Sequence, residues 1–166
     1  AFVSVRADNP DSFTVVALTS IQSGTEINFT DNGWQSSGSF RSNEGDFKWT
    51  ASKAYSCGDT FKVTTRSGVS LSTSGDQLFA YQGLSTNPTF IAGIHFNSTT
   101  WDANSTSSNT SALPSGLTNG TDAIAIGNVD NGKYDASTLS GSQTSLLSEI
   151  NDNTNWNTSS SPFAFM

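Results

Sequence analysis

Short runs in which apolar and polar residues alternate recur along the chain at intervals of about ten residues. Such alternation places apolar side chains on one face of a β-strand and polar side chains on the other. It is clearest at Glu26–Thr30 and Phe47–Thr50, whereas Phe90–Phe96 is a nearly continuous apolar run typical of a buried strand. Similar runs occupy Phe13–Leu18, Thr60–Thr65, Asp76–Gln82 and Ala123–Ile126. The pattern predicts about nine short strands.

One late segment has a different period. Leu146, Leu147 and Ile150 recur at helical spacing, and Ser140 to Gln143 has the Ser-x-x-Gln form of a capping box. We therefore expect one helix over Ser142–Asn151. The spacing of the strands favours a sandwich, and neither a repeat nor a linker divides the chain. The sequence predicts a single all-β domain over residues 1–166, an antiparallel β-sandwich with one short helix near the C-terminus.

Composition and charge narrow the classes of partner. Only 34% of the residues are hydrophobic and 13% charged, while aromatic residues make up 11%. This favours a folded β-protein with uncharged polar turns over a disordered chain. The net charge is −7 and the seven basic residues are scattered singly, so we expect no nucleic-acid partner. The longest apolar runs are too short to span a bilayer, so we expect no membrane insertion.

Six Asn-x-Ser/Thr sequons point to the secretory pathway. Each is a potential acceptor of an N-linked glycan in a eukaryotic secreted chain. Three of them fall within residues 97–111, a stretch dominated by Asn, Ser and Thr that we expect to be a glycosylated surface loop. The sequence thus predicts an extracellular, secreted protein with candidate glycosylation at Asn28, Asn97, Asn104, Asn109, Asn119 and Asn157.

The sequence does not present a catalytic constellation. His95 is the only histidine, it lies in an apolar run, and no nucleophile-elbow signature accompanies it. A structural histidine in a strand is the simpler interpretation. The three glutamates are far apart along the chain, so nothing indicates the paired carboxylates of a glycosidase. We expect the protein not to be an enzyme, and to need no cofactor beyond the structural calcium considered next.

Oxygen-bearing residues in the turns leave structural calcium open as an alternative. The weak candidates are Asp31, Asn32, Glu44 and Asp46, since calcium prefers carboxylate, amide and carbonyl oxygens. Their spacing does not match a calcium-binding loop, and Asp-Asn-Gly is primarily a turn sequence. We therefore expect no metal site.

Two aromatic residues are candidates for binding sugars, because exposed aromatic ring faces can stack on sugar rings. Trp101 stands in the sequon-rich stretch, and Tyr81 lies in a predicted strand. The alternative is that each ring fills the core. Cys57 is the only cysteine; it suggests either a bridge between chains or a buried thiol, and burial is the safer interpretation.

The two ends of the sequence are short and apolar. One of them could add to the sheet of a neighbouring copy, whereas in the simpler case both pair within their own domain. The candidate assembly strands cover residues 1–6 and 162–166. Together with Cys57, the candidate assembly residues are Phe2, Val3, Val5, Phe163, Phe165 and Met166.

Several motifs resemble a family of secreted β-rich modules of unassigned function, found in bacterial surface and exported proteins. They are Phe29–Trp34 (FTDNGW), 74–83 (SGDQLFAYQG), 88–93 (PTFIAG), 130–134 (DNGKY) and 146–152 (LLSEIND) with Trp156. The resemblance runs from about Phe13 to Trp156. It implies an extracellular accessory or structural module and supplies no catalytic residues. The dense sequons and Cys57 depart from the family pattern.

These observations favour a secreted, glycosylated structural protein that self-assembles into an extracellular coat, matrix or filament, with further copies of itself as partners. The alternative is a carbohydrate-binding or adhesion module with glycan partners, with or without the assistance of calcium.

Overall fold

The computed structural model describes residues 1–64, 68–135 and 139–163, and it contains two five-stranded sheets. The first sheet has the order β14 (Trp156–Ser159), β13 (Asn131–Tyr134), β1 (Phe2–Arg6), β2 (Ser12–Val16), β7 (Thr60–Thr64). The second has the order β11 (Ala123–Ala125), β9 (Asn87–His95), β8 (Gln77–Leu84), β3 (Glu26–Thr30), β6 (Asp46–Thr50). Two short pairs join β4 (Trp34–Gln35) to β5 (Ser39–Phe40), and β10 (Asn97–Ser98) to β12 (Gly127–Asn128).

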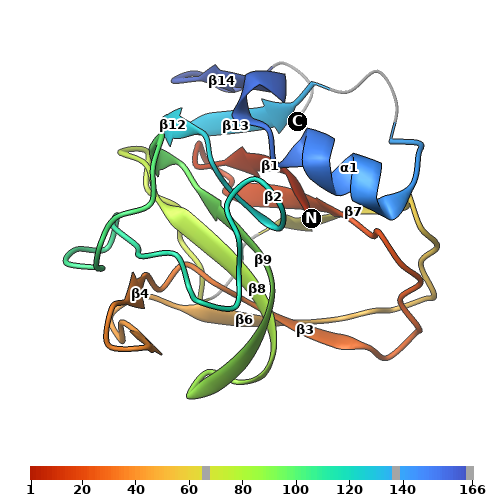
Figure 1. Cartoon of the computed structure of the whole chain (residues 1–166), viewed down its shortest axis with the longest axis horizontal. Helices are drawn as coiled ribbons and strands as arrows, with labels where there is room; N and C mark the ends of the chain where they lie inside the picture. The colour runs from red at the N-terminus through yellow and green to blue at the C-terminus, as the bar shows by residue number, and fades with distance from the viewer. Residues whose placement is uncertain (65–67, 136–138, 164–166) are drawn as a thin grey trace.

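The two sheets form the layers of a sandwich-like fold, with α1 beside the first sheet (Figure 1). The predicted all-β class is confirmed, and so is the helix near the C-terminus. All pairs in the two sheets are antiparallel except β11 with β9, which is parallel. The strands number more than the nine expected, because two-residue strands such as β4 and β10 are too short to show an alternating pattern.

The core lies between the two sheets and is rich in aromatic rings. Phe13 and Phe29 come from opposite sheets with ring centroids 4.8 Å apart, and Phe2 packs on both at 5.7 and 6.2 Å. Each fully buried phenylalanine contributes about 1.5–3 kcal/mol to the free energy of unfolding. Trp49 stacks on Phe61 at 4.1 Å, as its alternation with Phe47 indicated. These contacts tie the N-terminal strands to the second sheet.

A second, smaller apolar cluster covers the outer face of the second sheet. Phe79, Leu117 and Ala123 are buried there, and Trp34, Phe40, Phe90, Trp101 and Leu113 pack against them from the loops. Gly93 lies in this layer. A Cβ on Gly93 would come within 3.1 Å of both the Leu117 side chain and the Phe79 ring, so the glycine permits the close approach of these neighbours.

Local hydrogen bonds of the capping residues set the ends of helix α1 (Gln143–Ile150). The Ser142 side chain accepts a hydrogen bond from the Ser145 backbone N–H at 3.1 Å, so Ser142 is the N-cap. The predicted capping box at Ser140–Gln143 is therefore wrong by two residues. Leu146 and Ile150 are buried, and the 3₁₀ turn η1 (Asn153–Asn155) leads into β14. Among the described helices, none is long and apolar enough to cross a membrane.

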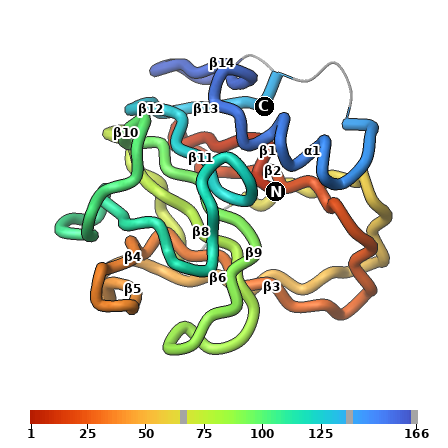
Figure 2. The backbone as a smooth tube through the Cα atoms, viewed as in Figure 1, coloured from red at the N-terminus to blue at the C-terminus, as the bar shows by residue number. Residues whose placement is uncertain are grey.

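The N-terminal strand lies inside the molecule. β1 pairs with β2 on one side and β13 on the other, and Figure 2 shows the red start of the chain in the same layer as β13 and β14. Phe2, Val3 and Val5 are buried in the core. The prediction that these three residues form an assembly surface is therefore corrected. They fill their own domain, which was the alternative that the sequence left open.

The sequon-rich stretch 97–111 is held against the body of the molecule. Ser105 and Ser111 are buried, and the Asn109 side-chain amide donates to the Gly75 carbonyl. β10 also occupies the start of the stretch. The expected surface loop thus packs in part against the fold, where its backbone and side-chain groups find partners, while Thr106 and Ser107 stay exposed.

Candidate functional site

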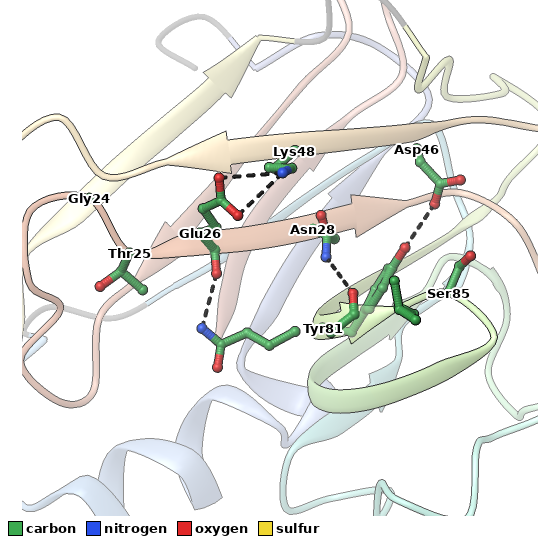
Figure 3. Close-up of a pocket in the computed structure, with 11 residues that line it drawn as sticks. Gly24, Thr25, Glu26, Asn28, Asp46, Lys48, Tyr81 and Ser85 are labelled. Atoms are coloured by element: carbon green, nitrogen blue, oxygen red, sulfur yellow. Dashed lines mark hydrogen bonds and ion pairs between the residues drawn. The ribbon is translucent and has the colours of Figure 1, made fainter.

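A polar pocket lies on the outer face of the second sheet, beside the smaller apolar cluster. The register of three neighbouring strands aligns Lys48 of β6, Asn28 of β3 and Tyr81 of β8 in one row. Because side chains alternate along a strand, Glu26 and Asp46 point to the same face one step along on each side. Figure 3 shows these side chains around the pocket, whose volume is about 760 Å³. The pocket is lined by Gly24, Thr25, Glu26, Asn28, Asp46, Lys48, Tyr81, Gln82, Gly83, Leu84, Ser85.

Tyr81 and Asp46 form the inner wall of the polar pocket. The Tyr81 hydroxyl donates to Asp46 Oδ1 at 3.1 Å (Figure 3). Burial, together with the Asp46 carboxylate, raises the pKa of Tyr81 well above its ordinary value. The hydroxyl therefore stays protonated at all physiological pH values and holds one oxygen of Asp46 in place.

The outer wall of the polar pocket consists of charged and amide side chains. Lys48 Nζ lies 3.2 Å from Glu26 Oε2, and both side chains are more than half exposed. Such an exposed ion pair contributes little to stability, at most about 1 kcal/mol. Asn28 Nδ2 donates to the Gly83 carbonyl at 3.1 Å, and Gln82 Nε2 donates to the Glu26 carbonyl at 2.9 Å. These two bonds fix the β8–β9 hairpin over the pocket.

A second concavity, the inter-sheet groove, opens between the layers near α1. Its volume is about 540 Å³. Apolar side chains from both sheets and the helix line it, including Leu18, Ile21, Ile27, Phe29, Ile91, Leu147. Ile91 is 41% exposed and Leu84, on the polar pocket, is 74% exposed; they are the exposed large hydrophobic residues of the described chain. The groove is thus apolar surface that the domain leaves accessible to solvent.

The candidate calcium residues are divided by the fold, and the side chains of Asp31 and Asn32 are occupied by internal bonds. Asp31 is buried and accepts the backbone N–H groups of Gly45 and Ser70, each at 2.8 Å. Asn32 bonds the Glu44 N–H at 3.0 Å, whereas Asp46 turns away to Tyr81. Within the described ranges, no cluster of three or more His, Cys, Asp or Glu side chains has the arrangement of a metal site. Asp31 and Asn32 act as anchors of the loop after β3.

Three acidic side chains lie close to one another beneath this loop. Burial raises the pKa of Asp76 to about 9 and that of Glu44 to about 8, and it raises the pKa of Asp31 as well. Asp76 accepts N–H bonds from Ser72 at 2.9 Å and from Gln77 at 2.8 Å, which oppose the shift. Only the fold brings Asp76 beside Asp31 and Glu44, because the three residues are far apart along the chain.

His95 is a structural histidine. It is fully buried, and its ring nitrogens lie 3.2 Å from the Thr100 carbonyl and 3.4 Å from the Asn109 carbonyl. Its Nε2 also lies 3.7 Å from the Asp102 carboxylate. Burial lowers the pKa of His95 below its ordinary value. The ring therefore holds the 97–111 segment to the end of β9.

The two candidate sugar-binding aromatics lie in different places. Tyr81 lines the polar pocket, with its ring buried and its hydroxyl at the wall. Trp101 is half-buried, its ring stacks on His95 at 5.2 Å, and its Nε1 donates to Asn119 Oδ1 at 3.0 Å. Trp101 thus belongs to the smaller apolar cluster and does not line the polar pocket.

The sequons differ in how their side-chain amides are used. Asn119 and Asn157 are exposed, whereas Asn28, Asn97, Asn104 and Asn109 are half-buried. The amide nitrogens of Asn28 and Asn109 donate to backbone carbonyls. In Asn97 and Asn104 the bonded atom is Oδ1, which accepts from Asn128 and from Ser36.

Among the remaining assembly candidates, Cys57 is exposed, and its Sγ donates to the Leu18 carbonyl at 3.4 Å. The expectation of a buried thiol is wrong. Phe163 is half-buried, and Phe165 and Met166 lie outside the described residues. The structure therefore leaves the assembly role of the C-terminal segment as a prediction.

Sequence reasoning named Tyr81, Asp46 and Asn28 for separate reasons and did not place them together. It missed Glu26, Lys48 and Gln82, although the alternation of β3 and β6 marked the outward positions of Glu26 and Lys48. Comparison with models of known protein families, with curated proteins and with solved structures finds no match to this chain. The resemblance to secreted β-rich modules therefore stays a prediction.

Proposed function

We propose that this chain is a secreted, glycosylated, non-enzymatic subunit that assembles with copies of itself into an extracellular coat, matrix or filament. In this proposal the apolar C-terminal segment 162–166 of one copy occupies the inter-sheet groove of the next. The observation that carries the proposal is the open groove itself, which exposes apolar surface between the two sheets. Accessible apolar grooves of this kind mark binding sites.

The size and chemistry of the groove support a peptide occupant. Its volume of about 540 Å³ suits two or three large side chains, and its lining is mostly apolar. Segment 162–166 reads Pro-Phe-Ala-Phe-Met, so it carries three large apolar side chains over five residues. Five extended residues span about 17 Å, enough to lay these side chains along the groove.

This contact joins two different surfaces of the same chain. A head-to-tail contact between unlike surfaces does not close on itself in a dimer, and it can extend into a ring or an open filament. The exposed amides of Asn119 and Asn157 lie outside the groove, so glycans on them leave this contact free. Glycans also discourage unwanted pairing of the open sheet edges.

A pair of complementary variants tests the proposal by size-exclusion chromatography and negative-stain electron microscopy. Ile91→Glu places a charge in the groove and keeps the segment, whereas Phe165→Ser weakens the segment and keeps the groove. We expect the unsubstituted chain to form polymers and each variant alone to stay monomeric. Mixed together, the two variants should form a complex of one copy of each and no longer chains.

Leu84→Glu is the matched control, because it adds the same charge at the most exposed apolar residue, outside the groove. It should polymerise as the unsubstituted chain does. The proposal is wrong if the unsubstituted chain is monomeric at high concentration, or if both Ile91→Glu and Phe165→Ser polymerise normally.

A further inference from the structure

The polar pocket has hydrogen-bonding atoms that the fold itself does not use. Among the described residues, Asn28 Oδ1, Gln82 Oε1 and Asp46 Oδ2 accept no hydrogen bond, although the other polar atom of each side chain is engaged. Each of these side chains is therefore held in position by one bond while its second polar atom is free. Side chains that are already fixed lose little conformational freedom when a ligand binds.

The charges of the polar pocket favour an uncharged ligand. Glu26 and Asp46 are acidic and Lys48 is basic, so the pocket carries one net negative charge. The chain as a whole carries −7. An anionic ligand would be repelled by both, and a simple cation would meet Lys48 at one end of the row. A neutral ligand with many hydroxyl groups can both donate to the carboxylates and accept from Lys48.

The rim of the polar pocket supplies an apolar contact. Leu84 projects from the β8–β9 hairpin with 74% of its surface exposed, next to Ser85. The volume of about 760 Å³ accommodates two or three sugar rings. A sugar ring presents C–H groups on one face and hydroxyl groups around its edge, which matches an apolar rim above polar walls.

We propose that the polar pocket binds a neutral oligosaccharide. Asp46 Oδ2 and Asn28 Oδ1 accept hydrogen bonds from sugar hydroxyl groups, Lys48 Nζ donates to a hydroxyl oxygen, and Leu84 contacts the C–H face of a ring. Binding needs no calcium. The polar pocket shares Thr25 and Gln82 with the inter-sheet groove, whereas the four residues named here line the polar pocket alone, so variants at these four residues test sugar binding apart from self-assembly.

Asn28 is itself a sequon, and a glycan attached there would occupy the polar pocket. The test therefore uses full-length protein made without N-glycans. Cellotriose, mannotriose and galactotriose are titrated as neutral probes and trigalacturonic acid as the anionic comparison, each with chelator present. Binding is followed by backbone amide chemical shifts in NMR spectra and by calorimetry.

We expect at least one neutral trisaccharide to bind and to shift the amide signals of β3, β6 and the β8–β9 hairpin. Asp46→Ala and Lys48→Met should each weaken its binding at least tenfold. Lys62→Met is the matched control, since Lys62 is an exposed lysine in β7 of the other sheet. It should bind as the unsubstituted protein does. Phe165→Ser should also bind normally, because residue 165 is not among the residues that line the polar pocket.

Several results would overturn the inference. One is the absence of shifts with all three neutral probes at tens of millimolar; another is tighter binding of the anionic probe. A third is equal weakening by Lys48→Met and Lys62→Met. A variant that fails to fold is recognised by its amide spectrum, and Leu84→Ala then provides a milder change at the rim, expected to weaken binding several-fold.

Discussion

At the scale of single residues, the hydrogen bonds of side-chain amides and carboxylates determine which polar atoms the surface leaves available to a ligand. The two carboxylate oxygens of Asp31, a candidate calcium ligand, accept hydrogen bonds from the backbone N–H groups of Gly45 and Ser70. Asp46, from the same candidate set, keeps one oxygen free at the polar pocket. The difference arises because Asp31 lies under a loop whose N–H groups need acceptors, whereas Asp46 lies on the outer face of a strand.

The same reasoning predicts which sequons carry glycans. A glycan replaces one hydrogen of the amide nitrogen and needs open space, and Asn109 has its nitrogen bonded to the Gly75 carbonyl in a half-buried position. In protein secreted from a eukaryotic host, we expect glycans on Asn119 and Asn157 and none on Asn109. Glycopeptide mass spectrometry measures the occupancy of each site.

Asn119→Gln and Asn109→Gln provide the matched pair for that measurement. The first should lower the mass of the secreted protein by one glycan and the second should leave the glycan mass unchanged. Full occupancy of Asn109 in folded, secreted protein would contradict the prediction.

At the scale of elements, close backbone contacts hold the loops onto the second sheet. Gly45 lies between β3 and β6 at the centre of one such contact: its carbonyl accepts from Thr30 Oγ1 at 2.6 Å, and its N–H donates to Asp31. A Cβ on Gly45 would lie 0.9 Å from the Gly68 carbonyl oxygen. The two backbones therefore touch at a point where only glycine fits.

Gly45→Ala should consequently lower the free energy of unfolding by at least about 3 kcal/mol, because the backbone must move to accommodate the methyl group. Gly38→Ala is the control. Gly38 has a φ of 86° and no neighbour within 4 Å of an added Cβ, so only the conformational cost of about 1–2 kcal/mol applies. Urea denaturation measures both. Equal losses in the two variants would refute the steric argument.

At the scale of the whole molecule, three buried acids link stability to pH. A carboxyl group whose pKa is raised in the folded state binds more protons there than in the unfolded chain. The free energy of unfolding therefore falls as pH rises from the unfolded pKa, about 4, towards the folded one. For Asp76 the folded pKa is about 9, so its contribution declines across the range from pH 5 to pH 9.

Asp76→Asn isolates this contribution, since an amide cannot titrate. The Ala1 amino group and His95, both with pKa values lowered by burial, titrate alike in the two proteins and cancel in the comparison. We expect the melting temperature of the unsubstituted protein, relative to Asp76→Asn, to fall steadily from pH 5 to pH 9. Asp152→Asn, at an exposed carboxyl group of lowered pKa, should show no such trend. A pH-independent difference between the unsubstituted protein and Asp76→Asn would argue against the raised pKa.

The local pattern of the sequence was enough to predict most of the long strands and the helix. β3 occupies Glu26–Thr30 as expected, and α1 lies within Ser142–Asn151, because alternation and helical spacing report which face of an element is buried. The pattern could not predict the two-residue strands.

The sequence by itself determined the all-β class, the helix and the outward positions of Asn28 and Lys48, since these depend on local periodicity. The tertiary structure alone decided which outward and inward side chains become neighbours. It buried Phe2, Val3 and Val5 between β2 and β13, divided Asp31 from Asp46, and aligned Lys48, Asn28 and Tyr81 across three strands. Strand order and register join segments far apart in the chain, and nothing in the local alternation of side chains encodes which strand pairs with which.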